Sequence, residues 1–220
     1  TLSTYYSFSG SHALARSLTL SASLGYRQME TTETPLVTTS EGIFGTLDAV
    51  QEMPNGTVFG GLDFDSSNAN ETFSLTMGRS LELRAGSLSA SVTSTTGDAF
   101  GTLFLGEVDY SKEIATGAIT FGLTQSISTN IDGDDVKFSR IGLGYSQELT
   151  STSDLSLAFD LNETHDLVSG VHATRTDFSA TYRHELTPDW DMSVGFQRRQ
   201  YSETGVGDAT SDAIFLNLSR

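Results

Sequence analysis

Apolar and polar residues alternate strictly along several stretches of the chain. Between Leu155 and Leu161 every second residue is large and apolar, and small or polar residues stand between them. The same period of two runs through 18–26 and 190–196. Because successive side chains of a strand point to opposite faces, each stretch predicts a β-strand with one apolar face.

These stretches belong to a unit that repeats about every 35 residues. A large aliphatic residue stands four places after the start of each unit, and the set is Leu14, Leu81, Ile114, Leu149 and Leu186. By subtraction the intervals are 67, 33, 35 and 37 residues, so a sixth, degenerate unit is expected near 43–47. Each unit has two alternating runs around a short break such as TPD or TSTS, which predicts a hairpin.

The alternation predicts thirteen strands in one domain spanning 1–220. They are 2–10, 17–28, 42–50, 57–66, 71–79, 86–95, 100–110, 117–128, 136–147, 154–163, 172–184, 190–202 and 212–220. Single-chain bacterial barrels have even strand numbers. We therefore expect about 14 strands, with a first strand preceding this chain, or twelve if 42–66 is one long loop.

A soluble antiparallel sandwich also alternates in this way, but three features favour a transmembrane antiparallel up-and-down β-barrel. The strands have about the 9–11 residues needed to cross a bilayer at a tilt. Their second face is built from Ser, Thr, Gly, Asn and Asp, which suits a wet interior. Aromatic residues near strand ends suit the membrane interfaces, namely Tyr26, Tyr110, Tyr145, Tyr182 and Trp190.

The chain resembles the outer-membrane β-barrel proteins of Gram-negative bacteria, the porin-like class, in its dyad strands, aromatic ends and acidic loops. The resemblance implies the cell outer membrane as location, with short periplasmic turns and longer acidic extracellular loops at 131–136, 165–170 and 203–210. Such barrels end on a terminal aromatic residue, whereas this chain ends AIFLNLSR. We therefore expect the natural protein to continue by a few residues.

Composition and charge narrow the classes of partner. The net charge is −16, with 28 acidic against 12 basic residues, which excludes a nucleic-acid-binding surface. The chain has no cysteine, and the acidic clusters at 63–71 and 132–135 lack the spacing of known calcium loops. We expect no cofactor and no metal. The expected partners are outer-membrane lipid and lipopolysaccharide, and other envelope proteins.

Charged residues on the polar face are the candidate pore-lining residues. By strand parity they are Arg27, Glu107, Asp109, Arg175, Asp177, Arg183 and Arg199. Arg175, Arg183 and Arg199 fall on two neighbouring strands. Two interpretations remain open: a basic stripe that selects anionic or zwitterionic solutes, or an ion-pair network that neutralises and stiffens the wall.

The pattern therefore favours a channel for passive passage of small polar solutes. The alternative is a structural anchor or translocator whose lumen is occupied, and 29–56, the longest link, is the segment long enough to fold inside. Catalysis is not expected, because the adjacent His165 and Asp166 come without a nucleophile motif. We do not expect an enzyme.

Overall fold

The structure is a computed structural model that describes every residue except 1, 34–35, 68–70, 99, 130–134 and 168. All the secondary structure in the described residues is β-sheet, and no helix among them is long and apolar enough to cross a membrane.

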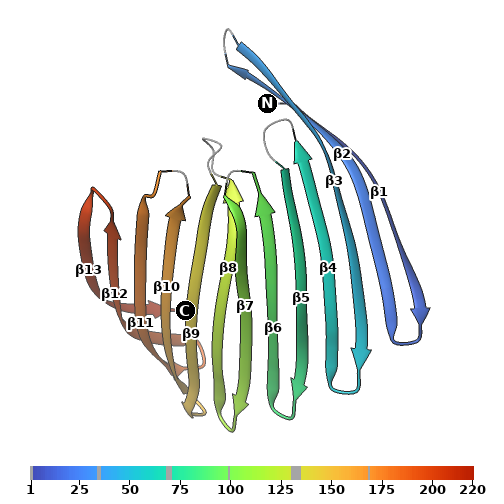
Figure 1. The fold of residues 1–220 in the computed structure, drawn as a ribbon. Coiled ribbons are helices and arrows are strands. Elements are labelled where there is room, and N and C mark those ends of the chain that lie inside the picture. The colour runs from blue at the N-terminus through green and yellow to red at the C-terminus, as the bar shows by residue number, and fades with distance from the viewer. Residues whose placement is uncertain (1, 34–35, 68–70, 99, 130–134, 168) are drawn as a thin grey trace. The chain divides into compact units, whose positions relative to one another are not determined.

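Thirteen strands follow one another along the described part of the chain, as can be followed in Figure 1. They are β1 (Leu2–Ala15), β2 (Leu18–Glu33), β3 (Leu36–Met53), β4 (Gly56–Ser67), β5 (Glu71–Leu83), β6 (Gly86–Gly97), β7 (Gly101–Ile114), β8 (Gly117–Thr129), β9 (Asp135–Thr150), β10 (Ser153–Asp166), β11 (His172–Thr187), β12 (Trp190–Glu203) and β13 (Gly207–Ser219). Each strand pairs with the strands next to it in sequence. The predicted all-β, up-and-down antiparallel architecture is confirmed.

By contacts within the chain the strands fall into two compact units. The first unit contains 1–81 and 90–106, and the second contains 82–89 and 107–220. Each unit is described by itself below. The expectation of a single domain over 1–220 stays a prediction.

Among the connections that the structure describes in full, six are two-residue turns, at 16–17, 54–55, 84–85, 115–116, 151–152 and 188–189. Glycine follows the turn directly in several of them. Gly56 and Gly86 have φ values of 135° and 153°, and a Cβ on either would stand 2.0 Å from a backbone oxygen of the next strand. Only glycine tolerates both conditions, so the sequence fixes where these hairpins turn.

The segment 29–56 is not a link. Its residues belong to the end of β2, to β3 and to the turn before Gly56, with only 34–35 outside the description. A plug built from this segment is therefore wrong, and so is the twelve-strand alternative, because 42–66 forms most of β3 and β4. The sixth repeat unit also lies later than expected, with its turn at 54–55 rather than near 43–47.

The strands contain 12 to 18 residues and are longer than predicted. As a result, the loop expected at 203–210 shrinks to 204–206, and the one at 165–170 becomes 167–171, while most of 131–136 lies outside the description. The physical reason is that alternation marks only the part of a strand with an apolar face. Backbone hydrogen bonds between strands need no apolar side chain, so polar residues extend each strand beyond its alternating part.

The sheet has one apolar face, and that face is not covered. On β10, Leu157 lies opposite Tyr145 and Ala180, and Phe159 lies opposite Leu143 and Phe178. Among the described large apolar side chains only Leu105 is buried, at 8% exposure. Leu24 of β2 is 56% exposed and Leu143 of β9 is 48% exposed. A soluble sandwich would bury these residues against a second sheet.

Candidate functional site

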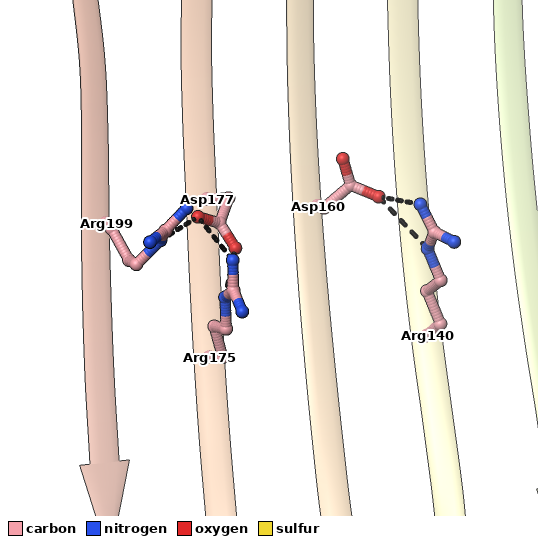
Figure 2. Close-up of polar contacts among 5 residues, drawn as sticks. All are labelled: Arg140, Asp160, Arg175, Asp177 and Arg199. Carbon is pink, nitrogen blue, oxygen red and sulfur yellow. Dashed lines mark hydrogen bonds and ion pairs between the residues drawn. The ribbon is translucent and has the colours of Figure 1, made fainter.

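Arg175, Asp177 and Arg199 meet on the polar face of the second unit (Figure 2). Asp177 lies directly opposite Arg199 in the β11–β12 register, and Arg175 lies two residues before Asp177 on β11. Arg175 Nε donates to Asp177 Oδ2 at 2.6 Å, and Arg199 Nε donates to Asp177 Oδ1 at 2.7 Å. One carboxylate therefore holds two guanidinium groups, and it is the least exposed of the three side chains, at 18%.

Arg140 and Asp160 extend this cluster across two further strands. Both Nε and Nη2 of Arg140 on β9 donate to Asp160 Oδ1 on β10, at 3.0 and 2.5 Å (Figure 2). Asp160 lies directly opposite Asp177 in the β10–β11 register. Two carboxylates in opposed positions repel one another, so the three arginines on either side of them are needed for neutralisation.

Arg140 and Asp160 were not among the predicted pore-lining residues, although strand parity places both on the polar face. On β9 the apolar residues are Ile141, Leu143 and Tyr145. Arg140 directly precedes this series, so its side chain points to the opposite, polar face, by the same parity that places Arg175 there. We call Arg140, Asp160, Arg175, Asp177 and Arg199 the arginine cluster. Together they line a groove of about 760 Å³ on the polar face of β9–β12.

Asp109 borders a neighbouring groove in the same unit. This groove holds about 510 Å³ and is lined by Asp109 of β7, by small residues of β8 and by the Arg140–Asp160 pair. Asp109 lies opposite Gly122, and Glu107 lies opposite Thr124 two residues away on the same face. The two predicted acids of β7 therefore share the polar face with the arginine cluster.

Arg183 lies apart from the other two arginines of the predicted basic stripe. It donates to Asp191 Oδ2 at 2.8 Å and lines a small depression with Glu148, Asp154 and Glu185, beside the two-residue turn at 151–152. It lies eight residues from Arg175 on β11, which is about 27 Å along a strand. Arg183 therefore stands apart from Arg175 and Arg199, and the basic stripe stays a prediction. Arg183 faces acids at one end of the strands, and Arg140 takes its place in the cluster.

Arg27 forms an ion pair in the first unit. Its Nη2 lies 2.6 Å from Asp65 Oδ1, so the side chain of β2 crosses β3 to reach β4. The residue of β3 opposite Arg27 is Gly42, which has no side chain in the way. Two further carboxylates, Asp48 and Asp63, lie on the same face of β3 and β4, where Asp63 is opposite Thr46.

Hydroxyl pairs occupy much of the remaining polar face of the first unit. Ser23 pairs with Thr46 at 2.8 Å across β2 and β3. Between β5 and β6, Thr76 pairs with Thr93 at 2.8 Å, and another such pair joins the same strands at 3.0 Å. These cross-strand bonds satisfy the hydroxyl groups without adding charge.

His165 and His172 lie together where β10 ends and β11 begins. His165 and His172 are opposite each other on β10 and β11 with stacked rings 4.0 Å apart, and His172 Nδ1 lies 3.2 Å from Glu163 Oε1. Asp166 Oδ1 instead accepts the backbone N–H of Ser169 in the following link. Within the described part of the chain, no group of three or more His, Asp or Glu residues is arranged to hold a metal ion.

Comparison with known proteins gives a distant likeness among solved structures. No protein-family model matches the chain, and no curated protein matches it. Among solved structures, the chain is similar to the NanC porin in a rhombohedral crystal form, with 13% identity and a TM-score of 0.32. The match covers 81% of this chain and 92% of the porin chain.

Proposed function

We propose that the chain forms the transmembrane β-barrel of an outer-membrane channel, with the apolar face toward lipid and the polar face lining a water-filled lumen. The observation that carries the proposal is the exposed apolar face. An antiparallel sheet in water must cover such a face, and here the large apolar side chains of both units remain accessible while almost none is buried. Lipid is the solvent that such a face fits.

The polar face supports passage of small polar solutes. It presents hydroxyl pairs and carboxylates in the first unit and the partly exposed arginine cluster in the second. Candidate pore-lining residues are Arg27, Glu107, Asp109, Arg175, Asp177, Arg183 and Arg199, to which Arg140 and Asp160 are added. Such side chains replace part of the hydration shell of a passing solute.

The alternative function is an anchor or translocator barrel with an occupied lumen. The segment offered as its plug, 29–56, belongs almost entirely to strands, which removes the observation that favoured this alternative. The lumen could instead be filled by part of another envelope protein, and the barrel would then be an anchor or translocator. The channel is therefore our leading proposal for the function.

Planar-bilayer recording of the purified, refolded chain tests the channel. Insertion should be verified first, by strand-type circular dichroism and by protection of the strands from protease in vesicles. We expect stable steps of current from the inserted protein. Silence from protein that passes both insertion checks would contradict a channel and favour the anchor.

A further inference from the structure

The arginine cluster carries a positive surplus in a strongly acidic chain. Three guanidinium groups and two carboxylates leave one positive charge in the groove, whereas the chain as a whole has a net charge of −16. The acids are held between the bases, with Asp160 and Asp177 directly opposed. A solute meeting this part of the polar face therefore encounters arginine on both sides of the two carboxylates.

Arg199 is the member with the most donors to offer. In the described part of the chain it donates through Nε to Asp177 Oδ1, and its side chain is 49% exposed. Arg175 uses both Nε and Nη2 on the same carboxylate. Because Asp177 holds Arg199 by Nε, the two terminal amino groups of Arg199 are positioned without being consumed by that bond.

Arg140 presents a second guanidinium at the other side of the groove. It uses Nε and Nη2 on one oxygen of Asp160 and is 56% exposed, which leaves Nη1 outside that contact. Phe138 and Tyr201 stand on the groove wall with Asn162 and Gln197. The groove thus combines planar donors, amides and aromatic faces.

Arginine suits oxyanions because its planar fork matches carboxylate and phosphate groups and is always charged. Half-exposed, prepositioned guanidinium groups bind such a group weakly and reversibly, as a conducting path requires. We propose that Arg199 and Arg140 form an oxyanion subsite in which each arginine offers its remaining donors to a carboxylate or phosphate group of a passing solute. This inference rests on the proposed channel function and names the class of solute that the channel favours.

The competing explanation is a network that serves the wall alone. In that case every donor of the cluster is committed to stability, and a solute feels only the general charge of the lumen. The two explanations differ in whether Arg199 itself contacts the solute. They are therefore separated by a second variant that removes the same charge from a different position on the same strand.

The test compares Arg199→Gln with Arg198→Gln in planar bilayers. Arg198 is the neighbour of Arg199 on β12 but lies on the opposite face, where it pairs weakly with Asp212 at 3.8 Å. Both variants remove one positive charge. We expect Arg199→Gln to shift the reversal potential in a potassium acetate gradient toward cations and to weaken current block by inorganic phosphate several-fold, with Arg198→Gln close to the parent. Equal shifts in both variants, or none in either, would overturn the subsite.

A binding measurement keeps the subsite testable if no current is found. Arginine Nε resonances of the folded chain in micelles are followed while acetate or inorganic phosphate is added. We expect the chemical shifts of Arg199 and Arg140 to change until they reach a plateau, and the chemical shift of Arg198 to remain constant. Signals that all move together, or none that moves, would reject the subsite. Binding without current would instead reject the channel and leave the subsite standing.

Discussion

The polar faces of the two units solve the same physical problem in different ways. In the first unit, hydroxyl pairs such as Ser23–Thr46 join neighbouring strands, and Arg27 is the partner of Asp65 near two further aspartates. In the second unit, arginines flank the two opposed aspartates of β10 and β11, and one carboxylate holds two guanidinium groups. Both arrangements satisfy polar groups beside water, but they leave surpluses of opposite sign.

This difference teaches that strand parity alone does not define a lumenal site. Parity assigns a residue to a face, whereas the charge that a solute meets depends on cross-strand register and on which side chain each arginine reaches. Arg175 and Arg183 share a strand and a face, yet one joins the arginine cluster and the other faces acids beside a turn. The apolar faces, by contrast, are alike in both units.

The largest predicted effect is a loss of folding stability when a charge is placed on the apolar face of either unit. Leu24→Arg in the first unit and Leu157→Arg in the second should each lower folding stability in lipid vesicles by about 2–4 kcal/mol, because a charge would enter the hydrocarbon. Urea titrations of folding measure the loss. Ser156→Arg, on the polar face beside Leu157, is the control and should cost little. A cost at Leu157 but not at Leu24 would mean that the two units do not share one lipid-facing belt.

A smaller effect separates the carboxylates of the two units. Asp177→Asn removes the shared partner of Arg175 and Arg199 and should cost about 1–3 kcal/mol, toward the lower end because both arginines remain half-exposed to water. Asp63→Asn removes one charge from the acidic group near Asp48 and Asp65, so it should be neutral or slightly stabilising. The same urea titration applies to both. Equal losses of folding stability from the two substitutions would show that the carboxylates of the two polar faces do not differ in this way.

The smallest predicted effect concerns the hydroxyl pairs of the first unit. Thr76→Val keeps the shape of the side chain and removes its bond with Thr93, which should cost about 0.5–1 kcal/mol because the partly buried Thr93 hydroxyl still reaches water. Thr76→Ser retains the oxygen and should lie nearer the parent. A loss as large as that of Asp177→Asn would show that neutral pairs hold the wall as strongly as ion pairs do.

Much of the fold was predictable from the sequence because apolar alternation and turn residues act locally. All thirteen strands were expected near their observed places, and the turns at 115–116, 151–152 and 188–189 coincide with predicted breaks. Strand ends were less predictable. Beyond the apolar face, polar residues continue the backbone ladder without any periodic signal, so β2, β3 and β13 extend into segments expected to be links.

The site was predictable by face but not by contact. Parity placed Arg27, Asp109, Arg175 and Arg199 on the polar face, as the structure shows. Contacts such as that of Arg27 with Asp65 cross an intervening strand, and they depend on register and on a glycine at the crossing point. Neither is encoded in the alternation of a single strand, which is why the exchange of Arg183 for Arg140 became visible only in three dimensions.

The most direct test of a lipid-facing and a water-facing side uses cysteine substitutions, because the chain has no cysteine of its own. Leu157→Cys and Ala158→Cys place single thiols on adjacent residues of opposite faces of β10. In protein folded into vesicles, a charged, water-soluble thiol reagent should modify position 158 and spare position 157, and a fluorophore at 157 alone should be quenched by brominated lipid. Equal reactivity at both positions, or quenching at 158 instead of 157, would contradict the membrane-spanning assignment.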